Sequence, residues 1–391
     1  MGFLSSEIRI VVAANFIAVA ARMSLVTFLG IYFVRKAGIE LGTVGLAFLA
    51  ESLLRGIAAP MFGALSDRIG RRALLIAAAL GTAVVLPSFL LVSGPASLFA
   101  WSVALGLTGA INMPVATALL LDLAPSERRQ SVLAVNYTAM SVAYTLGVMP
   151  AGYVAEQSYV VLAAISATGY LLVALLYALA SRAPPPLERK EAGMLMETVS
   201  AFRDRTFLGF AALAFVFPLS MGLVVVASPL FAADLNLGEG YIGLVLGGNS
   251  IIVALLAVPL ATRIEPLGPF RPLGAAAGVV ACGIACYALI PGAAAAYLVG
   301  TVVFSFGELV FSSAVPAAVA RLAPAGRRGA YQGGWTLVAS FSMGSALFFS
   351  GLLRDALGWR QAWMIYAAIT LAAAILLFSF RGRWSERRGE G

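Results

Sequence analysis

Long apolar segments alternate with short polar segments along the whole chain. A transmembrane helix needs roughly 20 mainly apolar residues to cross the hydrocarbon core of a bilayer. Twelve segments meet this requirement, with approximate limits 8–34, 42–65, 73–93, 97–121, 131–154, 158–180, 206–233, 240–262, 271–291, 295–320, 329–353 and 359–380. Because most connecting segments are short, neighbouring helices are expected to run antiparallel. The pattern predicts an all-α integral membrane protein with twelve transmembrane helices in a lipid bilayer.

The longest polar interruption, 181–205, divides the spans into two sets of six. It contains three prolines at 184–186 and a charged run at 188–191. Prolines and clustered charges stop a spanning helix. We therefore expect three parts: an N-terminal six-helix bundle over 1–180, a cytoplasmic linker with a possible surface helix over 181–205, and a C-terminal six-helix bundle with a short basic tail over 206–391.

The composition excludes most soluble classes of protein. Of 391 residues, 61% are hydrophobic and 11% are charged, whereas an ordinary soluble domain has about 25% charged residues. A soluble enzyme, a nucleic-acid-binding protein or a disordered scaffold would need more polar residues. The sequence contains no histidine, which removes Ser-His-Asp triads and histidine-based zinc or haem sites. We expect no enzyme activity, cofactor or metal site, and we expect Cys282 and Cys286 to be buried thiols.

The basic residues indicate the orientation in the membrane. With both chain ends on the cytoplasmic side, about twenty of the 26 Lys and Arg residues fall on that side, and only Arg35, Lys36, Arg354 and Arg360 fall on the outer side. Basic residues are retained on the cytoplasmic side during insertion. Topology therefore explains the net charge of +8 better than binding of nucleic acid does, and a multi-pass protein of the inner or plasma membrane is predicted.

Two loops repeat at a fixed offset. The sequence LAPSERR at 123–129 recurs as LAPAGRR at 322–328, 199 residues later, with five of seven positions identical. The same offset relates Gly152 to Gly351 and Glu156 to Asp355. Repeated six-helix halves are typical of secondary transporters that bind a small molecule near the midplane. Two pseudo-symmetric halves that work by alternating access, in a monomer, are therefore expected.

The loop after the second span contains the most specific motif. The segment 63–72, GALSDRIGRR, resembles the major facilitator superfamily signature G-x-L-x-D-R-x-G-R-R/K. The resemblance implies that Asp67 locks the two halves in the outward-facing state, through a helix-eleven N-terminus and nearby arginines. Physically, we expect Gly63 to allow close helix approach and Gly70 to allow a tight turn. The gating candidates are Gly63, Asp67, Arg68, Gly70, Arg71 and Arg72; the alternative is that the arginines only anchor the topology.

A second resemblance lies in the fifth span. Gly147, Pro150 and Gly152 are similar to a degenerate form of the antiporter signature G-P-x-x-G-G, and such residues bend a helix and allow close packing. The chain as a whole is closest in pattern to drug/proton antiporter-like members of the superfamily. The arginine that these members usually have in the fourth span is absent from the run WSVALG at 101–106, so Arg22 or Arg55 would have to replace it.

Four ionisable residues lie near the middle of predicted spans: Arg22, Glu51, Arg55 and Glu308. Each costs roughly 2.5–3.5 kcal/mol on translocon scales, which makes it a functional candidate. Glu51 and Arg55 are four residues apart on one helix face, and Arg22 lies at a similar depth on the adjoining helix. The sequence therefore predicts an Arg-Glu-Arg cluster. Glu51 could carry a proton, an arginine could bind an anionic substrate group, or the cluster could be a static ion network.

Glu308 has no basic residue at its depth in the second half. Since low dielectric disfavours its ionised form, it could carry a proton, neutralise a cationic substrate, or stay protonated and bonded to a backbone carbonyl or Ser305.

Neutral substrate-binding candidates within the spans are Asn112, Asn136, Tyr144 and Asn249. A cavity with few fixed charges favours proton-coupled efflux of lipophilic or amphipathic small molecules. The alternative is a permease or exporter of a small metabolite or organic anion, with Arg22 as the substrate anchor.

Overall fold

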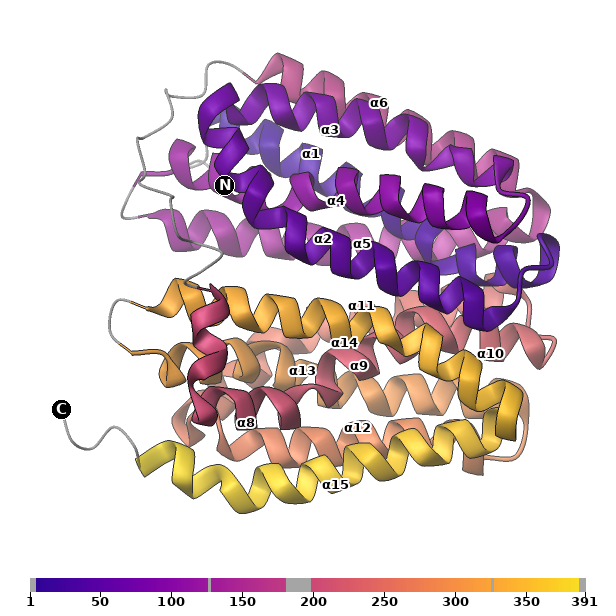
Figure 1. Ribbon diagram of the computed structural model, residues 1–391, viewed down its shortest axis with the longest axis vertical. Coiled ribbons are helices and arrows are strands. Elements are labelled where there is room, and N and C mark those ends of the chain that lie inside the picture. Colours follow the sequence, from indigo (N-terminus) through magenta and orange to yellow (C-terminus); the bar gives the residue numbers. More distant parts are fainter. Residues whose placement is uncertain (1–4, 126–127, 181–197, 325–326, 387–391) are drawn as a thin grey trace. The chain divides into compact units, whose positions relative to one another are not determined.

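The computed structural model describes residues 5–125, 128–180, 198–324 and 327–386 (Figure 1). Every regular element among these residues is a helix. Twelve helices or helix series are long and apolar enough to cross a membrane, which confirms the predicted all-α fold with twelve spans. Most of the predicted linker lies outside the described residues.

The chain forms two compact units. The first contains residues 1–192 and Gly238–Ser250, and the second contains Gly193–Leu237 and 251–391. The unit boundary therefore falls inside α11 (Glu239–Ile264), whose first half packs with the first unit. This division differs from a simple cut at the linker, because a helix that follows the linker in sequence lies partly against helices that precede it.

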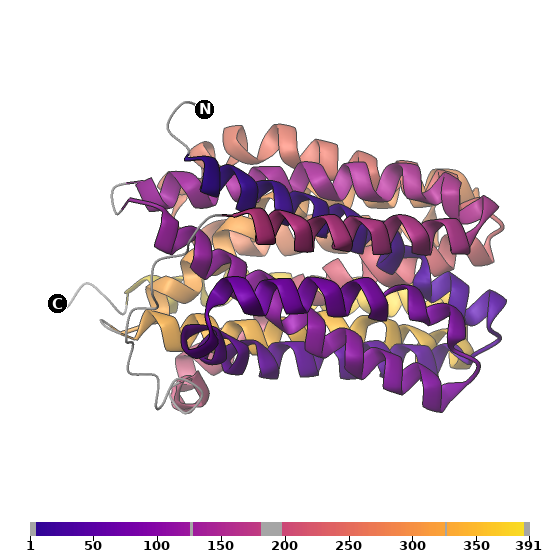
Figure 2. The ribbon, with the colours of Figure 1, turned by 90° about the horizontal axis from the view of Figure 1, so that it is seen from above.

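Six spanning helices make up most of the first unit, and they run along a common direction (Figure 2). The helix α1 packs on α5 and α6, α2 packs on α4, and α3 packs on both α4 and α6. Their bounds are α1 (Ser6–Ile31), α2 (Leu41–Ile69), α3 (Arg71–Val85), α4 (Pro95–Leu123), α5 (Arg129–Gln157) and α6 (Tyr159–Leu179). A π-helical turn, Tyr32–Lys36, extends α1.

The second unit begins with a span that is not one regular helix. The predicted span 206–233 consists of α8 (Arg205–Ala214), α9 (Val216–Gly222) and α10 (Ser228–Asp234), with a π-helical turn at Leu223–Ala227. The remaining helices are α12 (Arg271–Leu289), α13 (Ala293–Leu322), α14 (Arg328–Leu357) and α15 (Trp359–Glu386). Here α12 packs on α13 and α15, and α14 packs on α9.

Local sequence explains several helix ends. The Ser5 hydroxyl accepts the Ile8 N–H at the start of α1, and Asp204 accepts the Thr206 and Phe207 N–H groups at the start of α8. Such side chains satisfy amides that have no partner in the first turn. Between α2 and α3 the chain turns at Gly70, whose φ of 94° favours glycine. The predicted tight turn is therefore confirmed.

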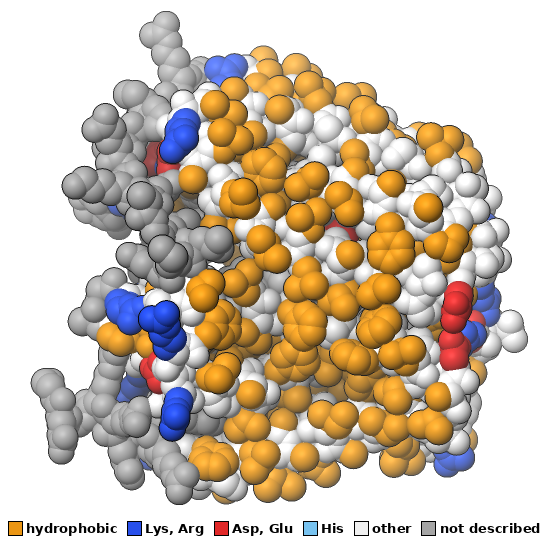
Figure 3. Space-filling view, viewed as in Figure 1, with side chains coloured by type: hydrophobic (Ala, Val, Ile, Leu, Met, Phe, Trp, Pro, Cys, Tyr) orange, Lys and Arg blue, Asp and Glu red, His pale blue; other side chains and the backbone are white. Residues whose placement is uncertain are grey.

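Apolar side chains remain exposed along the lengths of the helices. Leu91 is 80% exposed and Val84 is 70% exposed, and Figure 3 shows hydrophobic side chains along the helices with charged groups gathered at their ends. Lipid covers such faces in a membrane protein.

The expectation that both cysteines are buried is wrong, because Cys282 is exposed on α12. An apolar helix gives no sign of which side faces lipid.

Candidate functional site

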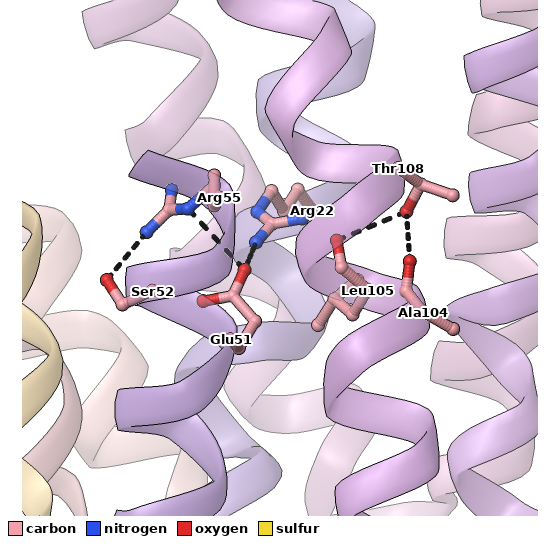
Figure 4. Close-up of polar contacts among 7 residues, drawn as sticks. All are labelled: Arg22, Glu51, Ser52, Arg55, Ala104, Leu105 and Thr108. Atoms are coloured by element: carbon pink, nitrogen blue, oxygen red, sulfur yellow. Dashed lines mark hydrogen bonds and ion pairs between the residues drawn. The ribbon is translucent and has the colours of Figure 1, made fainter. Parts of the chain in front are cut away.

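The predicted Arg-Glu-Arg cluster is present in the first unit (Figure 4). Glu51 Oε1 lies 2.7 Å from Arg22 Nη2 and 3.5 Å from Arg55 Nε. Arg55 Nη2 also donates to Ser52 Oγ at 3.2 Å. One carboxylate oxygen is thus shared by two guanidinium groups. We call Arg22, Glu51 and Arg55 the charged triad.

The three members of the charged triad differ in exposure. The Glu51 and Arg22 side chains are 8% and 13% exposed, whereas Arg55 is 36% exposed. The charged groups that act on Arg55 are Glu51 and Arg22, so the triad has one excess positive charge. Arg55 is therefore the member best placed to accept an additional anionic partner.

Glycines on α4 make room for the charged triad. A Cβ at Gly106 would lie 2.9 Å from the Glu51 carbonyl oxygen, and one at Gly109 would lie 3.3 Å from both Arg22 Nη1 and Arg55 Cδ. Any side chain at Gly106 would therefore push α2 away from α4. Sequence reasoning noted Gly106 only as part of a run without arginine and did not identify this spacing role.

A tyrosine that sequence reasoning missed joins α6 to the charged triad. The buried Tyr170 hydroxyl accepts a hydrogen bond from Arg22. Arg22 therefore has an ionic partner on α2 and a neutral partner on α6. No motif marks Tyr170, which lies in an apolar span, and only the packing of α1 against α6 brings the two together.

The predicted polar residues lie in different environments. Asn136 accepts from Asn15 Nδ2 at 2.8 Å, and the Tyr177 hydroxyl donates to Asn15 Oδ1 at 2.9 Å, so Asn136 belongs to a network linking α1, α5 and α6. Asn112 follows Gly109 by one turn on α4, and its buried Oδ1 has no hydrogen bond. The half-buried Tyr144 is on α5, the buried Asn249 on α11 and the half-buried Glu308 on α13.

The gating motif forms an ion network at the ends of α2, α3 and α4. Arg71 bridges Asp67, at 3.0 Å, and Asp122, at 3.1 Å. Arg72 Nε donates to the Tyr177 carbonyl at 2.9 Å, and Arg72 Nη2 donates to the Ala178 carbonyl, whereas Arg68 is exposed. Asp122 was not identified from the sequence, although its position at the end of the fourth span is compatible with an acid.

The close helix approach expected at Gly63 is not seen among the described residues, where a Cβ at Gly63 would meet no atom within 4 Å. The helix-bend motif behaves differently: a Cβ at Gly147 would lie 2.5 Å from the Ala20 carbonyl oxygen, and one at Gly152 would overlap the Glu239 carbonyl oxygen. Close packing at Gly147 and Gly152 is confirmed, while α5 remains helical through Pro150.

A second polar cluster in the first unit joins the ends of α5 and α6 to the start of α11. The Tyr159 hydroxyl donates to Glu239 Oε1 at 2.8 Å, and Glu156 Oε1 accepts the Gly240 N–H at 2.8 Å. Lys36 Nζ lies 4.5 Å from the Tyr159 ring centroid. In the sequence, Glu156 is marked only by its place in the repeat, which does not predict its hydrogen bond with Gly240.

Among the described residues, no group of three His, Cys, Asp or Glu side chains could hold a metal ion.

Sequence comparisons find transporters. The family model described as Major Facilitator Superfamily matches residues 11–295 and, in a second match, residues 210–390. An uncharacterized MFS-type transporter YqjV of Bacillus subtilis (strain 168) is 23% identical over 386 residues, covering 95% of this chain and 93% of the relative. A Na(+), Li(+), K(+)/H(+) antiporter of Planococcus maritimus is 26% identical over 341 residues, covering 78% of this chain and 79% of the relative.

Solved structures share the fold. The crystal structure of nucleoside transporter NupG superposes with a TM-score of 0.78 at 12% identity, covering 96% of this chain and 99% of that chain. The crystal structure of peptide transporter POT in complex with sulfate superposes with a TM-score of 0.76 at 15% identity, covering 98% and 96%. At these identities the likeness concerns the fold alone.

Proposed function

The chain belongs to the Major Facilitator Superfamily, and from this premise we propose that it is a proton-coupled transporter of a small organic anion, with Glu51 as the proton carrier and Arg55 as the substrate anchor. The observation that supports this proposal is the single Glu51 oxygen shared between Arg22 and the more exposed Arg55. The sequence favoured Arg22 as the anchor, but Arg22 has the shorter ion pair and is less exposed.

The coupling follows from charge balance in the charged triad. Protonation of Glu51 removes the only negative charge of the triad and leaves two guanidinium groups uncompensated at membrane depth, which is costly. An anionic substrate group bound to Arg55 restores the balance. Proton and anion therefore increase each other's affinity by the same factor, and they cross the membrane in the same direction. The unsatisfied Asn112 Oδ1, one turn away from Gly109, can accept a hydrogen bond from an N–H or O–H group elsewhere on the substrate.

Proteoliposomes that enclose a pH-sensitive dye test this proposal. Aromatic sulfonates are suitable anions, because they have no neutral form that crosses the bilayer passively. Adding them outside should acidify the interior with wild-type protein, and both Glu51→Gln and Arg55→Gln should abolish this acidification. Glu40→Gln, which changes an exposed acid just before α2, is the control and should retain it. Acidification that persists in both triad variants would contradict the proposal.

A second candidate is proton-coupled efflux of lipophilic or amphipathic molecules. The half-buried Glu308 on α13 and the antiporter among the relatives favour it. In that case a lipophilic cation placed inside the liposomes should drive proton movement in the opposite direction to its own. Glu308→Gln should abolish this exchange, while the charged triad variants should leave it intact.

We also infer a gating role for the network around Arg71. Asp67 and Asp122 both pair with Arg71 at the ends of three helices, so these three side chains together have a net charge of −1. Loss of Asp67 would remove this excess negative charge. The arginines near the starts of α1, α3 and α5 support a cytoplasmic location for both chain ends. We infer that the protein acts as a monomer in the inner or plasma membrane and needs no cofactor.

A further inference from the structure

Two adjoining cavities form a seam along α1 and α5. The larger has a volume of about 750 Å³ and is lined only by these two helices, from Arg9 and Ala134 at one end to Ile17 and Val142 at the other. The smaller, about 240 Å³, continues toward Pro150 and Val154 and also touches α6. Phe16 and Ile17 line both cavities, so the two cavities adjoin there.

The wall of the seam is apolar except at one end. The Thr138 hydroxyl donates to the Ala134 carbonyl and the Ser24 hydroxyl donates to the Ala21 carbonyl, each at 3.0 Å, so neither hydroxyl has a proton left to donate to an anionic ligand. Arg9 is the charged residue of the lining, it is exposed, and it has no ion pair among the described residues. A ligand that fits must therefore combine a long apolar part with an anionic end.

The seam lies on the opposite side of α1 from the charged triad. At 3.6 residues per turn, Ala20, which lines the smaller cavity, is about 160° around the helix from Arg22. On α5, the lining residues Val135, Val142 and Leu146 share an apolar face. The seam therefore lies away from the candidate substrate site.

The size and charge of the seam fit a phospholipid. From Ala134 to Val142 the larger cavity extends about 12 Å along α5, and the seam as far as Val154 extends about 30 Å, at 1.5 Å per residue. An extended acyl chain fits within this length. At the mouth, α5 begins with the exposed Arg129, about one and a half turns before Ala134, while Glu7 is the acid in the first turn of α1. The basic side chains outnumber this acid.

We propose that the α1–α5 seam binds one anionic phospholipid, with its phosphate at Arg9 and an acyl chain along Phe16 and Val142. This inference does not depend on the proposed transport function. A Lys or Arg near the membrane surface favours an anionic lipid by about 1 kcal/mol, which corresponds to about a fivefold preference.

Native mass spectrometry tests this site with protein released from micelles that contain equal amounts of phosphatidylglycerol and phosphatidylcholine. Wild-type protein should retain one lipid, with about a fivefold preference for phosphatidylglycerol. Arg9→Gln should still retain a lipid but without headgroup preference. Arg203→Gln, which removes an exposed arginine of the second unit, is the matched control and should behave as wild type.

Filling the seam tests the position of the acyl chain. Ala139→Phe should reduce lipid retention, and the smaller change Ala13→Leu should do so partially if the first variant does not fold. A full preference for phosphatidylglycerol in Arg9→Gln would overturn the proposal. Equal retention of both lipids by the wild type would also overturn it, as would undiminished retention in a folded seam-filling variant.

Discussion

Arg22 and Glu51 lie on different helices, 29 residues apart in the sequence, and their side chains form a 2.7 Å ion pair with little exposure to solvent. Glu51 is the ion-pair partner of Arg22 among the described residues, whereas Glu51 also has a second, longer contact with Arg55 at 3.5 Å. The two arginines therefore depend on Glu51 in unequal ways, and this asymmetry leads to a test by substitution.

We expect Glu51→Gln to destabilise the protein more than Arg22→Gln. The first change leaves the buried Arg22 and the partly exposed Arg55 without a counter-charge, and removing one partner of a buried pair typically costs about 3–5 kcal/mol. The second change leaves Glu51 paired with Arg55 at net charge zero and should cost less. Thermal unfolding midpoints in detergent measure this order, with the exposed Glu40→Gln as the control. The reverse order would show that Glu51 does not hold the triad together.

Gly106→Ala should weaken the packing of α2 on α4. The added Cβ would meet the Glu51 carbonyl oxygen at 2.9 Å, and overpacking of this kind typically costs about 1–3 kcal/mol. Gly278→Ala on α12 is the matched control, because nothing lies within 4 Å of its Cβ position and alanine is the better helix former. Unfolding midpoints should fall for Gly106→Ala and stay level or rise for the control. Equal midpoints would contradict the spacing role.

Asp204, which lies just before the seventh span, predicts a pH dependence of stability. Burial acts to raise the pKa of its carboxyl group, but hydrogen bonds from the Tyr331 hydroxyl and the Thr206 and Phe207 amides hold that pKa below its ordinary value. A depressed pKa gives stability that is present above the pKa of the unfolded chain, about 3.9, and that is lost as the pH falls through the lower pKa of the folded protein.

Tyr331→Phe should therefore lower the unfolding midpoint at pH 6, and the difference from wild type should shrink below about pH 4. The measurement is the unfolding midpoint as a function of pH for both proteins. Asp204→Asn keeps a capping side chain but has no carboxyl to titrate, so this part of the pH dependence should disappear. A difference between Tyr331→Phe and wild type that is constant over the whole range would contradict the assignment.

Asp67→Asn should reduce transport at least tenfold while leaving the amount of protein in the membrane unchanged. The substitution removes the Asp67–Arg71 ion pair of 3.0 Å and leaves Arg71 with Asp122 alone. Arg68→Gln is the control within the same motif, because the exposed Arg68 has no bonded partner among the described residues. Equal transport by Asp67→Asn and wild type would mean that the motif only fixes topology.

Hydropathy and spacing predicted the twelve spans and the charged triad, because bilayer thickness fixes span length and an interval of four residues fixes a helix face. Contacts between distant helices leave no such periodic signal. The bond from Arg22 to Tyr170, the bridge from Arg71 to Asp122 and the docking of Glu156 on Gly240 therefore emerged only from the structure. The exposed Cys282 and the uncrowded Gly63 show the same limit, since lipid-facing and core-facing positions are equally apolar.

Infrared difference spectroscopy tests the proposed coupling most directly, by comparing the protein with and without a bound aromatic sulfonate. If Glu51 takes up a proton when the anion binds Arg55, the difference spectrum should gain the carbonyl band of a protonated carboxyl group. That band should be missing in Glu51→Gln and present in Glu308→Gln. A band that persists in Glu51→Gln, or that is lost only in Glu308→Gln, would contradict proton binding at Glu51.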